Sequence, residues 1–369
     1  MSRSLRPSRQ ISNLLYSSIP RNYSTEAPKA SVKLIAEIRK RIEGTSLTKA
    51  REALQATNND LQAALEWLEK DIAVSGAAKA AKLQGRTTGE GLIALAILGR
   101  GGWNDKGRPQ GVRAAMIELN CETDFVARNS LFVDLAQDVA YSAAYLTEPS
   151  NAGDGLVNQL TVDALSDAPM MSSNPASTPS AISISESIRN GIAKLGEKIS
   201  LRRACTLVSD PLQDPTLGLA LSSYVHGGVS GTAQSATTTV LQAGRMGSLV
   251  ALGLRSQGLP SAILSNTFNF GEDLSSLGRS LAMQVTGLNA TAIRGSNELL
   301  EQGNPEAMAL YDQPFMMRMG APTEESVGKV LKDWAEGRKL VQGGEGGEGV
   351  EVVQFQKWAV GEPIEESSS

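Results

Sequence analysis

Residues 31–75 carry the spacing of three short amphipathic helices. Between residues 32 and 42 apolar side chains recur every three or four positions, which places them on one helical face. Thr45 or Ser46 can cap a second helix, and a third begins after the Asn-Asn-Asp turn at 58–60. Three such helices within about 45 residues would bury one small shared core.

Beyond Gly85 the pattern changes to that of strands. Residues 91–98 form a continuous apolar run, as expected of a strand buried on both faces. A Gly-rich loop separates this run from a returning strand at 112–120, and residues 129–146 resume helical spacing. This part of the chain is therefore predicted to be an antiparallel hairpin followed by a helix.

The same order recurs further along the chain. The remaining predicted elements are helices at 182–196, 274–286 and 324–335 and strands at 199–208, 217–225, 247–254 and 351–360. Two consecutive segments thus read as a hairpin and then a helix. We expect an α+β protein in which a three-helix domain precedes two related α+β core subdomains with antiparallel sheets.

The first 25 residues have a composition of their own. They contain four arginines, seven serines and no acidic residue, which is typical of a mitochondrial transit peptide. Residues 21–24 resemble a matrix-protease cleavage site, with cleavage after Tyr23. We expect the mature protein in the mitochondrial matrix; the alternative is a disordered basic tail.

The predicted segments can now be given in chain order. They are a transit peptide at 1–25, a three-helix domain at 31–75, a linker at 76–84, core subdomain 1 at 85–146, a flexible Ser- and Pro-rich insert at 147–181, core subdomain 2 at 182–290, a C-terminal part completing the core at 291–360 and a disordered tail at 361–369.

Charge points to a protein partner. Without residues 1–25 the chain keeps 31 of its 35 Lys and Arg residues against 39 acidic ones, a net charge of −8. Phosphate binding draws mainly on basic side chains, so direct nucleic-acid binding is not expected. No apolar run has the length of a bilayer span, so a membrane partner is not expected either.

The sequence lacks the residues that most catalytic sites require. The single histidine, His226, precludes a histidine-rich metal site, and the two cysteines form no CxxC pair. No phosphate-binding glycine motif is present. We therefore expect no enzyme activity, no metal and no cofactor.

The segment 119–129, LNCETDFVARN, is the most informative one. Taken alone it is a strand-to-helix corner in which Thr123 or Asp124 caps a helical turn. Phe125 could then fold into the core or point outward. Cys121 could be a reactive thiol or, as we favour for a residue ending a strand, small core.

The whole segment resembles the signature of the elongation factor Ts family, in which a strand runs into N-C-x-T-D-F-V-A. Further stretches resemble that family in the same order. They are the helices at 34–69, GAAKAAKLQGRTTGEG at 76–91, AKLGEKISLRR at 193–203, SYVHGG at 223–228 and QPFM at 313–316. Residues 58–68 also resemble ubiquitin-associated domains, so the N-terminal domain is expected to have that fold.

The resemblance implies a guanine-nucleotide exchange factor for mitochondrial elongation factor Tu, bound both in its GDP form and free of nucleotide. Asp124 and Phe125 would enter the GTPase beside its nucleotide and disturb the Mg²⁺–phosphate site. Cys121, Thr123 and Val126 flank them in the motif. Lesser contacts are implied at Leu195, Gly196 and His226, although a histidine before two glycines is also a common turn residue.

Two other functions are compatible with parts of the sequence. A ubiquitin-binding adapter would use residues 31–75 and would not depend on Phe125. An enzyme in the 85–290 core would need chemistry that the residues above do not supply.

Overall fold

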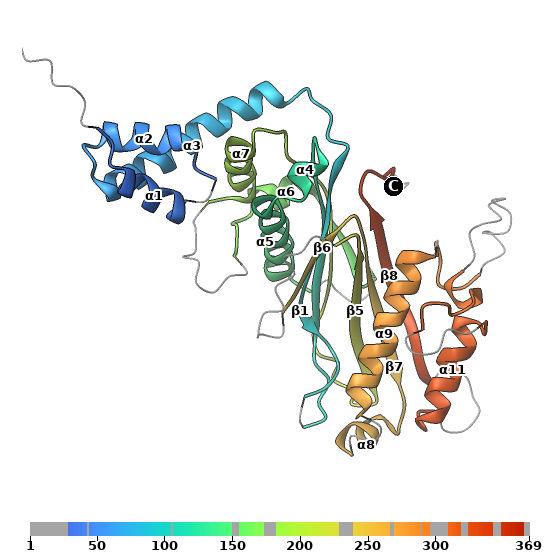
Figure 1. Ribbon diagram of the computed structural model, residues 1–369. Helices are drawn as coiled ribbons and strands as arrows, with labels where there is room; N and C mark the ends of the chain where they lie inside the picture. Colours follow the sequence, from blue (N-terminus) through green and yellow to red (C-terminus); the bar gives the residue numbers. More distant parts are fainter. Residues whose placement is uncertain are drawn as a thin grey trace, which may run out of the picture. The chain divides into compact units, whose positions relative to one another are not determined.

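In a computed structural model of the protein, the described residues are 29–42, 44–104, 106–149, 155–172, 182–228, 239–265, 269–288, 290–295, 309–318, 324–341 and 348–364. They fall into two compact units that divide between Leu68 and Glu69. Helices precede a core built on antiparallel sheets (Figure 1), so the predicted α+β class is confirmed. The predicted transit peptide lies outside the described residues.

The first unit contains the expected three helices. They are α1 (Val32–Arg41), α2 (Leu47–Ala56) and the first part of α3 (Leu61–Leu83). The Ser46 hydroxyl accepts the Lys49 N–H at 3.2 Å and caps α2, while Asp60 accepts the Ala63 N–H at 2.9 Å at the start of α3. A small apolar core forms between them, with Ile38, Leu54 and Leu68 fully buried.

Helix α3 continues through residues 76–83, so most of the segment expected to be a linker is helical. Gly76 lies inside the helix, where its missing side chain allows the backbone of Arg189 to come close. A Cβ at position 76 would lie 2.7 Å from the carbonyl oxygen of Arg189. Lys79 Nζ also donates to the Ala193 carbonyl at 2.6 Å. The second half of α3 is thus packed on α7 (Ile184–Leu195) within the second unit.

The second unit contains two antiparallel sheets. The larger has the order β3-β4-β2-β1-β6, with β1 Glu90–Arg100, β2 Val112–Cys121, β3 Val157–Leu160, β4 Ser200–Ser209 and β6 Val240–Gly244. The smaller has the order β5-β7-β8, with β5 Leu217–His226, β7 Met246–Arg255 and β8 Gly349–Ala359.

Side-chain alternation along the strands explains how the sheets stack. On β1, Leu92, Ala94 and Ala96 face a helical layer, whereas Ile93, Leu95 and Ile97 face the second sheet. Successive strand residues point to opposite faces, so a strand between two apolar layers needs apolar residues throughout. This accounts for the unbroken apolar run at 91–98.

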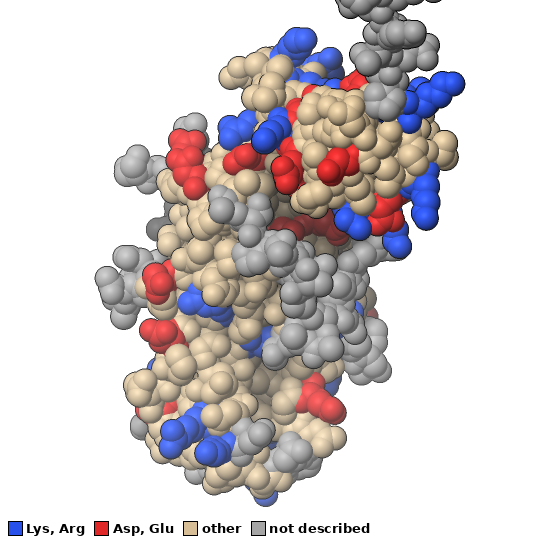
Figure 2. Space-filling view, turned by 90° about the vertical axis from the view of Figure 1, so that its left-hand side faces the viewer, with Lys and Arg blue, Asp and Glu red and all other residues tan. Residues whose placement is uncertain are grey.

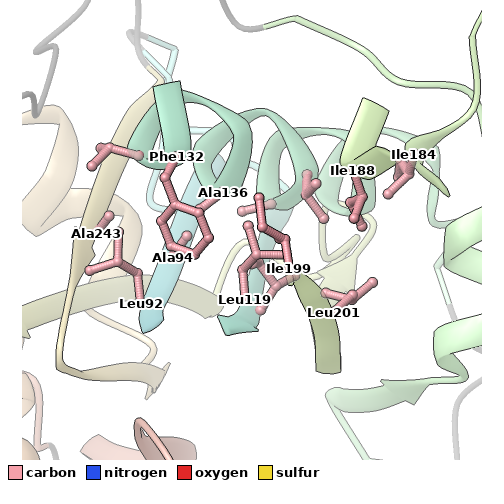
Figure 3. Packing of buried hydrophobic residues seen from close by; sticks show 14 of the residues in the cluster. Leu92, Ala94, Leu119, Phe132, Ala136, Ile184, Ile188, Ile199, Leu201 and Ala243 are labelled. Carbon is pink, nitrogen blue, oxygen red and sulfur yellow. The ribbon is translucent and has the colours of Figure 1, made fainter. Parts of the chain in front are cut away.

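Helices cover the outer faces of both sheets. The larger sheet is covered by α4 (Asp124–Ala127), α5 (Ser130–Leu146), α6 (Val162–Asp167) and α7, with Phe132 and Ile188 among the buried contacts (Figure 3). The smaller sheet is covered by α8 (Leu259–Leu264), α9 (Phe270–Gly287), the 3₁₀ turn η2 (Leu310–Asp312) and α11 (Val327–Gly337). The order within this unit is helices, sheet, sheet, helices.

Three further segment predictions need correction. The insert expected to be flexible contains β3 and α6, since β3 pairs with β4 and Leu165 of α6 is buried. The boundary at 182 is misplaced, because β4 pairs with β2 in the larger sheet. The tail is ordered at its start, where the Gly361 N–H donates to Glu118 at 2.8 Å; residues 365–369 lie outside the described part.

Basic and acidic side chains are interspersed over the face shown in Figure 2. Local ion pairs also occur on the N-terminal helices, such as Arg41–Glu37 and Lys49–Glu52. Among the described helices, none is both long enough and apolar enough to cross a bilayer.

Candidate functional site

The corner between β2 and α4 holds the motif residues. Thr123 caps the single turn of α4, its hydroxyl accepting the Val126 N–H at 3.4 Å. Val126 and Ala127 are buried in the core beneath. Because the turn directs Val126 inward, Phe125 points outward and leaves 83% of its surface exposed. Of the two conformations left open by the sequence, the structure has the outward one.

Asp124 lies beside Phe125 on the same turn. Its carboxylate forms an exposed ion pair with Arg128, 3.2 Å away and one helical turn later. Ion pairs of this kind contribute less than about 1 kcal/mol. Asp124 is therefore free to exchange Arg128 for another cationic or donor group at little cost.

Cys121 ends β2 and is buried, so it serves as core. Its Sγ donates to the Thr123 carbonyl oxygen at 3.2 Å. Burial, and after it the nearby Glu197 carboxylate, raise the pKa of this thiol to about 12. Burial likewise raises the pKa of Cys205 to about 12.

Both thiols should be inert in the folded protein. With a pKa of about 12, only about one thiol in ten thousand is ionised at pH 8, and the thiolate is the reactive form. A colorimetric disulfide reagent should therefore label neither cysteine in the native protein and both after denaturation in guanidinium. Rapid native labelling of either thiol would contradict this placement.

A second corner, between α7 and β4, lies against the first. Leu195 is half-buried against the core, and Gly196 ends α7 in the left-handed conformation with φ of 79°. The next residue, Glu197, reaches across: its carboxylate accepts the Thr123 N–H at 3.0 Å and the Thr123 hydroxyl at 2.6 Å. The structure thus joins the segment of Leu195 and Gly196 to that of Asp124 and Phe125.

The exchange of hydrogen bonds between the corners is reciprocal. The Glu122 carboxylate accepts the Lys198 N–H at 2.7 Å and pairs with Arg86 at 3.1 Å. The Lys198 N–H, followed by Arg86, lowers the pKa of the Glu122 carboxyl. Lys198 Nζ in turn donates to the carbonyls of Gln84 and Arg86 at 2.8 and 2.7 Å, so three chain segments are joined here.

His226 ends β5 in the smaller sheet and is exposed. Its carbonyl oxygen accepts the Arg245 N–H at 3.0 Å, and the Arg245 side chain pairs with Glu90. Glu90 lies opposite Cys121 in the β1–β2 ladder. His226 is therefore at the same end of the strands as the motif corner, although no hydrogen bond joins it to Phe125 or Gly196.

Sequence reasoning missed Glu197 and Lys198. Both lie in the AKLGEKISLRR stretch, so the signal was a carboxylate directly after the helix-ending glycine. The partner of Glu197, Thr123, lies 74 positions away and could not be identified from spacing.

No group of His, Cys, Asp and Glu side chains suited to a metal ion occurs among the described residues.

Comparison with known proteins identifies the family. The family model described as Elongation factor TS matches residues 122–302, which include both corners. A protein of Coprinopsis cinerea named "Elongation factor Ts, mitochondrial" is 45% identical over 99% of this chain and 100% of its own length. Proteins of the same name from Laccaria bicolor and Mycosarcoma maydis are 44% and 35% identical, over 94% and 91% of this chain and 96% and 86% of theirs.

The chain therefore belongs to the elongation factor Ts family, whose members act in translation elongation as nucleotide exchange factors and work with elongation factor Tu. It is a mitochondrial member of that family, as its near full-length relatives are.

Proposed function

We propose that this protein releases GDP from mitochondrial elongation factor Tu by inserting Phe125, with Asp124 beside it, next to the Mg²⁺–phosphate site of the GTPase. The main support is the exposure of Phe125: an aromatic side chain 83% exposed on a well-anchored corner has little to bind on its own chain. Aromatic side chains are enriched at protein–protein interfaces, where a few residues carry most of the binding energy.

The chemistry of the partner's site makes a small displacement effective. Mg²⁺ requires near-octahedral geometry at about 2.0–2.1 Å and tolerates little movement of its ligands. Its loss leaves the phosphate charge of the nucleotide under-compensated. A side chain that moves the metal-binding loop of the GTPase therefore weakens the binding of the nucleotide without contacting the nucleotide itself.

Energetics require more than Phe125. Burying one phenylalanine yields about 1.5–3 kcal/mol. A nucleotide bound at nanomolar strength is held by about 12 kcal/mol, and a ten-thousand-fold faster release needs a barrier lower by about 5.5 kcal/mol. We propose that Leu195, Gly196 and His226 supply further contacts, since all three lie at the same end of the strands as Phe125.

Coupling between the two ligands of the GTPase must be reciprocal. A factor that weakens GDP binding is itself bound less tightly when GDP is present. The protein would therefore bind the GDP complex weakly, hold the nucleotide-free GTPase tightly and be displaced by incoming GTP.

The ubiquitin-adapter alternative gives the core no role, whereas the family relationship extends over the whole chain.

Release of a fluorescent GDP tests this proposal directly. The mitochondrial GTPase is loaded with the labelled nucleotide and chased with excess unlabelled GDP. We expect the protein to accelerate release on the order of ten-thousand-fold, which corresponds to a barrier lower by about 5.5 kcal/mol. A GTPase of another class serves as the control. An unchanged release rate for mitochondrial elongation factor Tu would refute the proposed function.

A further inference from the structure

We infer that Glu197 is a positioning residue for nucleotide exchange: its hydrogen bonds to Thr123 fix the direction in which α4 presents Phe125. This inference rests on the proposed function above. Glu197 itself follows Gly196 on a different corner, 72 positions from Phe125 in the sequence.

The argument starts from the isolation of the Phe125 side chain. With 83% of its surface exposed, it has little packing to hold its position. Its direction is therefore set by the backbone of α4. A helix of one turn is not stable by itself, because nucleation costs more than a single turn returns, so tertiary anchors must hold it.

Thr123 is the anchor at the start of that turn. Its hydroxyl donates to Glu197 Oε1 at 2.6 Å and accepts the Val126 N–H at 3.4 Å. Donation to a carboxylate fixes the hydroxyl rotor, leaves its lone pair toward Val126 and polarises it as an acceptor. The second carboxylate oxygen holds the Thr123 N–H at 3.0 Å, so both the backbone and the side chain of the capping residue are fixed by one group.

Removing the Glu197 side chain should loosen α4 without unfolding the corners. The other half of the reciprocal arrangement stays in place, since the Lys198 N–H still donates to Glu122 and Lys198 Nζ to Gln84 and Arg86. Val126 and Ala127 also remain in the core. The expected consequence is a less well-directed Phe125 in a folded protein.

A double-mutant cycle on GDP release, with the melting temperature of each variant, tests this role. Glu197→Ala and Thr123→Val should each reduce the acceleration roughly tenfold, as loss of a charge-assisted hydrogen bond at the positioning group predicts. Thr123→Ser keeps the hydroxyl and should exchange nearly as the wild type does. In the Phe125→Ala background, Glu197→Ala should cost less than about a further twofold, because residues acting through one another are not additive.

Asp214 offers a matched control. Its Oδ1 accepts the Thr216 N–H at 2.8 Å and the Thr216 hydroxyl at 2.7 Å, the same pair of bonds at the far end of β4. Asp214→Ala should leave exchange unchanged.

The outcomes separate the two proposals. Wild-type exchange by Glu197→Ala would overturn the positioning role, and so would a loss that adds in full to that of Phe125→Ala. In either case the proposed function would stand, provided that the wild type accelerates release. If the wild-type protein does not accelerate release, the proposed function fails, and the positioning role fails with it.

Discussion

Replacing Phe125 by alanine should remove most of the acceleration of GDP release while leaving the protein folded. The lost burial of the ring against the GTPase is worth about 1.5–3 kcal/mol, which corresponds to a reduction of roughly ten- to a hundredfold. Stability should not change measurably, because the ring is exposed in the free protein. The measurement is the release rate of labelled GDP at saturating factor, together with thermal unfolding.

Tyr145 provides the matched control for this prediction. It is an aromatic residue 52% exposed at the far end of α5, about 24 Å of helix away from the motif corner. Tyr145→Ala should exchange at the wild-type rate. If Phe125→Ala were equally active, the role proposed for this side chain would be wrong, even if the protein proved to be an exchange factor.

A second large effect is expected at Glu118, a fully buried carboxylate on β2. Arg203 Nε binds it at 2.6 Å and the nearer guanidinium nitrogen of Arg202 at 3.0 Å. The side chain of Asn120 and the Gly361 N–H donate to it as well, at 3.1 and 2.8 Å. This one carboxylate therefore ties the end of β8 to the larger sheet.

Glu118→Gln should lower the free energy of unfolding by about 3–5 kcal/mol. The amide keeps the shape but removes the negative charge, which leaves Arg202 without its counter-charge and Arg203 paired with Glu362 alone. Guanidinium denaturation of the two proteins measures the difference. Glu336→Gln breaks an exposed ion pair with Lys332 on α11 and should cost less than about 1 kcal/mol. Equal stabilities of the Glu118 and Glu336 variants would contradict this account.

Local pattern was sufficient for most elements, because each is specified by its own spacing. The apolar run at 91–98 and the helical spacing at 129–146 correspond to β1 and α5 within about two residues. The short elements β3 and α6 were missed, since four and six residues are too few to show a clear period and their order comes from pairing with β4 and packing on the core. Residues 76–83 were predicted as a linker although they continue α3, because Gly76 is required by the close approach of α7 and not by a turn of its own.

The residues of the candidate site likewise differ in whether the sequence alone could identify them. The motif, and with it Asp124 and Phe125, was recognisable in one continuous stretch. Glu197 was not, because its role depends on a residue 74 positions away. The alternative of a Phe125 folded into the core could not be excluded by spacing, since a one-turn helix can direct any of its residues inward.

The sequence by itself determined the positions of most helices and strands and the resemblance to the elongation factor Ts family, both of which depend on residue types at short range. Only the tertiary structure decided which strands share a sheet, that Phe125 points outward and that the two corners are joined through Glu197 and Thr123. The reason is physical: pairing, burial and carboxylate hydrogen bonds act between residues distant in the chain, and local spacing carries no record of them.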